Sequence, residues 1–291
     1  MIHSLQTGLL HVDINDFGAE LSSIFSKKTK TEYLWQGDPK HWEQRAPVLF
    51  PIVGRLKDGK YTYNGKEYNM SIHGFAAGTQ FTTEGQIGDS IMFTMEDTKE
   101  TRAIYPFSFT FSVIFTLQWN VLETIYEVTN KSDGTMYFNF GSHEGYRCPW
   151  GEGEAFDDYF LEFDRDSDYT ILKGSENNLM TDETECIIKN GRRLQLNYDL
   201  FANDSLPFAN IPSGKVILGS NKSIPKIEIN YGDAPNLVIW TRKGAPYVCI
   251  EPWYGMPDYE GTDGDLTKKR GIISLKKGGI FNWTHQITIY E

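Results

Sequence analysis

A histidine at the end of a short aromatic strand is the residue of this sequence best suited to proton transfer. Residues 137–142 read Tyr-Phe-Asn-Phe-Gly-Ser, which predicts an extended segment that breaks at glycine. His143 comes next and is followed at once by Glu144. A strand that turns on glycine can hold a side chain rigidly at the rim of a sheet. We interpret His143 as a general acid. The alternative is a buried histidine that completes a core, and the residues alone give the two about even weight.

A glutamate at a second strand end could supply the matching base. The apolar run Val248–Ile250 ends in Glu251, which is followed by Pro252 and Trp253. A carboxyl group beside an aromatic surface is partly desolvated, which raises its pKa towards the range of a general base. Trp253 could stack on the apolar face of a sugar ring. The alternative is a structural glutamate that ends the strand.

Two further polar residues follow apolar runs. Arg55 follows Pro47–Gly54, and a buried arginine would need a partner. Its planar fork suits paired sugar hydroxyls or a carboxylate, whereas from this segment alone a surface ion pair is the favoured interpretation. His73 is followed by Gly74, which lets a ligand or a backbone approach closely.

Period-two alternation indicates the elements that must position these residues. Phe107, Phe109, Phe111 and Val113 share one face of a predicted strand. Asn64-Gly65 predicts a hairpin between residues 61–63 and 66–68. Further strands are predicted at Ile91–Met95, Leu122–Val128, Phe160–Phe163, Lys215–Leu218, Lys226–Tyr231, Leu237–Trp240, Tyr247–Ile250 and Ile280–Tyr290. In the last of these, we interpret His285 as a packed core residue.

Helical periodicity is scarce in the sequence. Only Asp38–Gln44 and Asp182–Lys189 could carry a helical turn or two. Gly255–Gly264 is rich in Gly, Asp and Pro and predicts a loop at the rim. Many short strands with turns between them predict an all-β sandwich or barrel, and we expect residues 1–291 to form one domain.

Composition excludes several classes of partner. The net charge of −11 argues against a nucleic-acid or anionic-membrane surface. Three cysteines without repeated spacing make a poor disulfide framework and a poor zinc site, so we expect no metal and no cofactor. The first residues lack the pattern of a secretory signal, and we expect a cytoplasmic protein.

Four segments in this order resemble the aldose 1-epimerase (galactose mutarotase) superfamily, and most of all its LacX-like, galactose mutarotase-related branch. They are Phe50–Leu56 with Gly59–Tyr61, His73–Phe75, Gly141–His143 and Cys249–Trp253. Each alone is a weak signal, whereas the four together cover essentially the whole chain. The resemblance implies a β-supersandwich of antiparallel sheets with an open sugar cleft.

The resemblance also implies cofactor-free interconversion of the α and β anomers of a hexose. By motif, Glu251 resembles the family's base and His143 its acid, while His73 and Arg55 resemble the sugar-binding pair. Asp204, within Leu200–Phe208, lies where the family has a sugar-binding aspartate, but its surroundings differ from those in true galactose mutarotases. We expect His143 to be protonated and Glu251 ionised, with a carboxylate such as Glu144 near the histidine.

Three alternatives remain open at this point. A glycoside hydrolase needs two carboxylates across a sugar, which Glu251 with Asp204 or Glu144 could supply. A carbohydrate-binding protein without activity could use the same aromatic cleft. A hexose-6-phosphate mutarotase would need a basic phosphate contact, such as Lys57, Arg147 or Arg242. The expected partner is a small-molecule aldose, a hexose, and the chain is expected to be a monomer or a homodimer.

Overall fold

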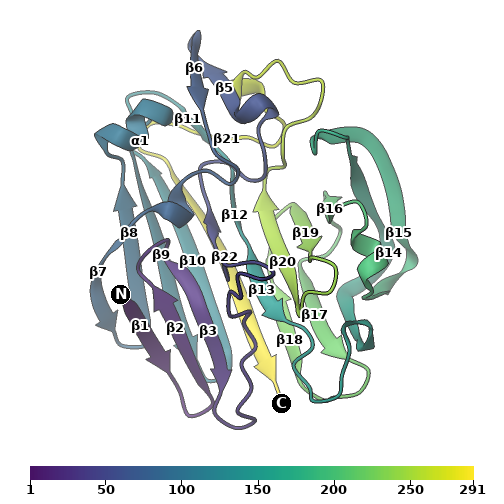
Figure 1. Cartoon of the computed structure of the whole chain (residues 1–291). Helices are drawn as coiled ribbons and strands as arrows, with labels where there is room; N and C mark the ends of the chain where they lie inside the picture. Colours follow the sequence, from purple (N-terminus) through teal and green to yellow (C-terminus); the bar gives the residue numbers. More distant parts are fainter.

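The computed structural model describes all residues, 1–291, and is built almost entirely of antiparallel β-strands (Figure 1). This confirms the predicted all-β class. The largest sheet has 15 strands. In order across the sheet, 13 of them are β4 (Val48–Leu49), β12 (Phe140–Ser142), β20 (Tyr247–Tyr254), β19 (Asn236–Trp240), β16 (Ser205–Ala209), β14 (Tyr159–Gly174), β17 (Lys215–Ser220), β18 (Lys226–Asn230), β22 (Ile280–Tyr290), β10 (Val121–Asn130), β9 (Phe109–Gln118), β8 (Ser90–Glu96) and β7 (Thr82–Ile87).

Two more strands join this sheet at its sides, and three small sheets complete the β-structure. β13 (Glu144–Arg147) pairs with β20, and β15 (Met180–Gln195) pairs with β14. The small sheets contain β1 (Ile2–Gln6), β2 (Leu10–Asn15) and β3 (Glu20–Ser26); β5 (Lys60–Tyr63) and β6 (Lys66–Asn69); and β11 (Met136–Phe138) and β21 (Ile273–Leu275).

Helical structure is limited to short segments. The one α-helix is α1 (Lys99–Ile104), which Thr98 caps by accepting a hydrogen bond from the backbone N–H of Thr101. Single 3-10 turns occupy Lys57–Gly59, Ala76–Gly78, Phe156–Asp158, Tyr198–Phe201 and Leu266–Lys268. None of the helices has the length and apolar character needed to cross a membrane.

The core lies where the alternating pattern places it. β10 alternates buried and partly buried residues along its whole length, and Phe109, Phe111 and Val113 of β9 are fully buried. The largest cluster of buried apolar residues has 64 members and extends from Leu5 to Ile289, so both ends of the chain contribute to it. The first sheet packs on the main sheet, where the ring of His3 meets Phe93 edge-on at 5.3 Å (Figure 1).

Of the two segments that could carry a helical turn, the first forms one turn and the expectation for the second is wrong. Residues 38–44 form one turn, in which the N–H groups of His41 and Trp42 both donate to the carbonyl of Asp38. Residues 182–189 belong to strand β15, which pairs along most of the length of β14. Cross-strand pairing overrides the weak helical pattern in β15, because local propensity is small compared with a long ladder of hydrogen bonds.

Glycines let the strands around His143 approach large aromatic rings. On β12, a Cβ atom at Gly141 would lie 2.5 Å from Cδ1 of Trp253. On β13, a Cβ atom at Gly145 would lie 2.9 Å from Cζ3 of Trp42. Real side chains do not approach this closely, so each ring occupies space that only glycine leaves free.

We predict that Gly141→Ala lowers the free energy of unfolding by about 1–3 kcal/mol, because the added methyl group overpacks against Trp253. Gly134→Ala is the matched control, since its Cβ would meet nothing within 4 Å. Urea denaturation of both variants and the wild type measures the difference. Equal stability of the two variants would contradict the proposed close packing.

Candidate active site

His143 and Glu251 lie opposite each other on neighbouring strands. Gly141 of β12 pairs with Trp253 of β20, and Glu144 of β13 pairs with Ile250 in the same register. The residue between β12 and β13, His143, therefore stands opposite Glu251. Side chains opposite each other in an antiparallel pair project from the same face of the sheet. The predicted acid and base are thus brought together from positions 108 residues apart, as the difference between their numbers shows.

The two side chains are buried and closely spaced. Nε2 of His143 lies 3.2 Å from Oε2 of Glu251, and the two residues are 8% and 1% exposed. Their mutual orientation does not make a hydrogen bond, and both carboxylate oxygens and Nδ1 of His143 lack a hydrogen-bond partner. Buried polar atoms are normally paired. Unpaired atoms on two adjacent functional groups favour a site that awaits the polar groups of a ligand.

Burial favours the uncharged forms of both groups. It lowers the pKa of His143 well below its usual value, and neighbouring His73 lowers it further. Burial raises the pKa of Glu251 well above its usual value, with added contributions from Glu144 and Asp204. Burial therefore favours a neutral imidazole and a neutral carboxylic acid in the free protein. This differs from the expected protonated His143 and ionised Glu251, because the sequence does not reveal how completely the strands exclude water.

His73 presents a defined hydrogen-bond donor. Its backbone has φ of 65°, and the N–H of Gly54 donates to its Nδ1 at 3.1 Å. Burial lowers the pKa of His73 to about 4, and the charge of Arg55 adds to this effect, so the ring is neutral at pH 7. With Nδ1 accepting, the proton is on Nε2. The ring lies edge-on to those of His143 and Trp253, at 5.4 and 5.7 Å between centroids.

Arg55 makes no ion pair in the structure. Its guanidinium is absent from the salt bridges and side-chain hydrogen bonds of the chain, so the surface ion pair considered from the sequence does not form. The residue is partly buried and lines a hollow of about 520 Å³ together with Lys57, Ser71 and Asn177. A guanidinium without a protein partner is available to a ligand.

Asp204 is connected to His143 through the side chain of Trp240. It precedes β16, has φ of 85° and is exposed, and its Oδ1 accepts a hydrogen bond from Nε1 of Trp240 at 3.1 Å. The ring of Trp240 lies 5.9 Å from that of His143. Asp204 therefore stands at the outer edge of the candidate site.

The aromatic surfaces of the site differ from the one expected. Trp253 is only 5% exposed and packs in a separate apolar cluster with Leu49 and Val238, so little of its face is open to a sugar. Trp42 and Trp240 are more exposed, and Trp42 stacks on the His143 ring at 5.0 Å with an angle of 30°. The sequence analysis missed both as site residues. Only the structure reveals that Trp240 pairs with Cys249, two residues from Glu251.

Glu144 projects from the opposite face of the sheet and is not the partner of His143. Its carboxylate accepts a hydrogen bond from the Ser142 hydroxyl at 2.9 Å and approaches Nδ1 of His285 at 3.6 Å. His285 is fully buried and stacks on Trp283, which confirms its interpretation as a core residue. Adjacent residues of a strand point to opposite faces, which excludes Glu144 as a direct partner.

Three potential metal ligands meet at the site. One ligand atom each from His143, Cys249 and Glu251 lie within 4.8 Å of one another, and all three residues are buried. Thiolate, imidazole and carboxylate together are ligands that zinc accepts. The set could therefore hold an ion, and metal-independent function stays a prediction.

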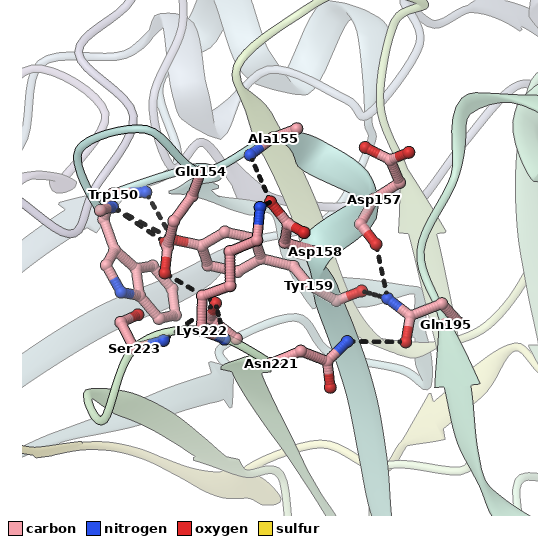
Figure 2. Close-up of polar contacts among 12 residues, drawn as sticks. Trp150, Glu154, Ala155, Asp157, Asp158, Tyr159, Gln195, Asn221, Lys222 and Ser223 are labelled. Atoms are coloured by element: carbon pink, nitrogen blue, oxygen red, sulfur yellow. Dashed lines mark hydrogen bonds and ion pairs between the residues drawn. The ribbon is translucent and has the colours of Figure 1, made fainter.

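A second group of carboxylates is fully engaged in structural contacts (Figure 2). Glu154 accepts hydrogen bonds from the hydroxyls of Tyr159 and Ser220, while Asp158 pairs with Lys222 at 2.7 Å. These contacts fasten the loop after β13 to β14 and β17. Because the carboxylates of Glu154 and Asp158 already bind protein partners, we interpret this network as structural and not as a second catalytic pair.

Comparison with known proteins agrees with the fold. The family model described as aldose 1-epimerase matches residues 1–278, and the chain belongs to this family. Protein LacX of Lactococcus lactis subsp. lactis is 32% identical over 265 residues, which are 88% of each chain. The galactose mutarotase related enzyme from Lactobacillus acidophilus is 36% identical, with a TM-score of 0.95 over 100% of this chain and 98% of that one.

A second solved structure shows the same similarity. The galactose mutarotase-like protein from Lactobacillus casei is 29% identical, with a TM-score of 0.94 over 100% of both chains. The similarity to LacX and to these two structures confirms the resemblance to the LacX-like branch. Membership in the family supports a mutarotase-type function.

We predict that Glu144 makes stability depend on pH. Burial raises its pKa to about 7, whereas an unfolded glutamate titrates near pH ~4.3. Because the pKa of Glu144 is higher in the folded state, its protonated form stabilises the fold at low pH. This contribution to the free energy of unfolding is lost as the pH rises from the unfolded pKa to about 7. The loss is roughly 4 kcal/mol. The Glu144→Gln variant has no ionisable group at this position, so it should not show this pH-dependent loss of stability.

Urea denaturation at pH 5 and pH 8 measures this effect as the change in stability difference between Glu144→Gln and wild type. The variant should gain on wild type at pH 8, and contributions from groups that do not interact with Glu144 cancel in the comparison. Glu67→Gln, at an exposed ion pair with Lys60, is the control. A constant difference across this range would show that Glu144 is ionised in the folded protein.

Proposed function

We propose that the protein is an aldose 1-epimerase that interconverts the α and β anomers of a hexose by opening and closing the sugar ring. The observation that carries this proposal is the buried pair of His143 and Glu251, 3.2 Å apart, with unpaired atoms on both groups. One proton acceptor and one proton donor at this spacing can serve the C1 hydroxyl and the ring oxygen of a pyranose.

The reaction needs two proton transfers and no redox step. Glu251 takes the proton of the C1 hydroxyl, His143 gives a proton to the ring oxygen, and the bond between C1 and that oxygen breaks. Rotation about C1–C2 turns the other face of the aldehyde to the hydroxyl formed from the ring oxygen, and the two groups then act in reverse. All atoms of the sugar are retained, and the pair regains its original protons.

Burial assists the ring-opening direction of this exchange. Opening converts an ionised Glu251 and a protonated His143 into a neutral carboxylic acid and a neutral imidazole. These are the forms that burial favours, as the raised pKa of Glu251 and the lowered pKa of His143 indicate. The polar groups of the sugar, together with its positioning, would stabilise the charged forms before the transfer.

The remaining residues hold the sugar in this proposal. Nε2–H of His73 donates to a sugar hydroxyl, the free guanidinium of Arg55 binds a pair of hydroxyls, and Asp204 accepts from the outer side. Trp42 and Trp240 provide apolar surfaces beside His143. The ring of Trp253 packs against the edge of the His73 ring, and its buried, unpaired Nε1–H is a potential hydrogen-bond donor to the sugar.

A phosphorylated hexose is the second candidate substrate. Arg55 and Lys57 line the same hollow, where two cations could meet a phosphate. Polarimetry on freshly dissolved α-glucose and α-galactose, each with and without a 6-phosphate, separates the two substrates. A reducing-sugar assay on glycosides tests hydrolysis, and sugar binding without turnover would favour the binding-protein alternative.

We predict that Glu251→Gln lowers turnover by about two orders of magnitude or more, because the amide cannot accept the C1 hydroxyl proton. Sugar binding should change far less. His143→Asn should act similarly, and the double variant should be little worse than the worse single one, since the two residues act as a unit. Polarimetric rates at saturating sugar measure this, with Glu67→Gln as control. Near wild-type turnover in Glu251→Gln would refute its assignment as the base.

We predict a bell-shaped pH profile of kcat/KM whose limbs belong to the pair. On the acid side, the first proton leaves the doubly protonated pair mainly from His143, whose pKa is lowered. On the alkaline side, the last proton leaves Glu251, whose pKa is raised. Nitrogen chemical shifts of the His143 ring should accordingly report a neutral imidazole at pH 7 in the free protein. An imidazolium at that pH would contradict the inferred order of protonation.

A further inference from the structure

A buried ion pair lies close to the candidate sugar-binding arginine. Nζ of Lys269 is 2.7 Å from Oδ1 of Asp258, and each side chain is 4% exposed. Lys269 also donates to the carbonyl of Met256 at 2.8 Å. Burying two charges has a large desolvation cost, so a buried ion pair is weak evidence for added stability. A role in positioning neighbouring residues is the alternative explanation.

Two other polar groups of Asp258 bind the backbone at Arg55 and at Lys57. The N–H of Asp258 donates to the carbonyl of Arg55 at 2.8 Å. Its Oδ2 accepts a hydrogen bond from the N–H of Lys57 at 2.9 Å. One aspartate thus fixes the backbone at Arg55 and two residues beyond it, while Lys269 fixes the aspartate.

Contacts of Gly54 connect the Asp258 loop to His73. A Cβ atom at Gly54 would lie 2.5 Å from Cγ of Pro257, so the two loops touch without a gap. Gly54 exchanges two hydrogen bonds with His73: its N–H donates to Nδ1 at 3.1 Å, and its carbonyl accepts from the His73 N–H at 2.9 Å. A displacement of the Gly54–Lys57 segment would therefore move both candidate binding residues.

Asp258 is also tied closely to the candidate base. Strand β20 contains Glu251 and ends at Tyr254, and Asp258 follows in the next loop. The route from Glu251 to Arg55 through Asp258 consists of seven residue steps and one backbone hydrogen bond, as their numbers show. The route along the chain alone spans nearly two hundred residues.

We propose that Asp258, held by Lys269, is a positioning residue that fixes Arg55, and through Gly54 also His73, relative to Glu251. This inference rests on the proposed function for its effect on sugar binding. A displacement of about 1 Å in a binding group can cost on the order of a hundredfold in rate, so a rigid connection between the two loops matters to the reaction.

Kinetics of charge-removed variants test the inference. The double replacement Asp258→Leu with Lys269→Met removes both charges and the oxygen that accepts from the N–H of Lys57, and it leaves no unpaired buried charge. We expect KM to rise about tenfold or more, with a smaller change in kcat. The control is Asp133→Asn with Lys277→Met, which removes an exposed pair of 2.8 Å and should leave KM unchanged. A wild-type KM in the Asp258 variant would overturn the proposal.

Combination with Arg55→Ala separates positioning from a general structural role. If Asp258 acts through Arg55, removing the ion pair from the Arg55→Ala protein should raise KM little further. Full multiplication of the two effects would show that Asp258 acts independently and would overturn the proposal. Should the double replacement fail to fold, Gly54→Ala disturbs the same loop contact without touching the ion pair, and the same non-additivity with Arg55→Ala is expected.

Hydrogen exchange provides a readout that does not depend on activity. In the charge-removed variant, or in Gly54→Ala, the amides of residues 54–58 should exchange at least about tenfold faster than in wild type, while those of β9 keep their protection. Unchanged exchange at residues 54–58 would overturn the inference even if the protein is an active mutarotase. Faster exchange there would support the connection even if no aldose is turned over, in which case the proposed function alone has failed.

Discussion

Exclusion of water from a carboxyl group and an imidazole 3.2 Å apart is the constraint on which the candidate site depends. His143 and Glu251 are held by neighbouring strands, so their spacing is fixed by the sheet and not by flexible loops. In water each group would take its ordinary charge. Inside the sheet the neutral forms are favoured, because burial raises the pKa of Glu251 and lowers that of His143.

Large rings make this exclusion possible, and glycines make room for the rings. Trp42 covers His143 from one side, while Trp253 fills the space beside Gly141. A site lined in this way offers flat apolar surfaces with few polar groups between them, which is the usual make-up of a small-molecule site. The polar groups that remain unpaired are those that a sugar's hydroxyls could satisfy.

Two loops and one strand share the task of holding the ligand-binding groups. Arg55 and His73 come from segments early in the chain, whereas Glu251 comes from β20. Hydrogen bonds join the first two through Gly54, and the Asp258 contacts join them to the loop after β20. The arrangement puts rigid backbone between groups that must act on the same sugar. In this proposal the buried ion pair of Asp258 and Lys269 positions the backbone that carries Arg55.

Local sequence determined the strands and the identity of the chemically capable residues. Period-two alternation around Phe109 and Phe111 and the Asn64-Gly65 turn each fix local structure, because side-chain direction and turn geometry depend on near neighbours. His143, Glu251 and Arg55 were recognisable because each ends a run of aromatic or apolar residues, and His73 because Gly74 follows it. Only the tertiary structure decided that Glu144 faces away, that Trp253 is covered, that Trp42 and Trp240 border the site, and that residues 182–189 form a strand. Each of these depends on which strands pair and in what register, and that is set by contacts between residues far apart in the chain.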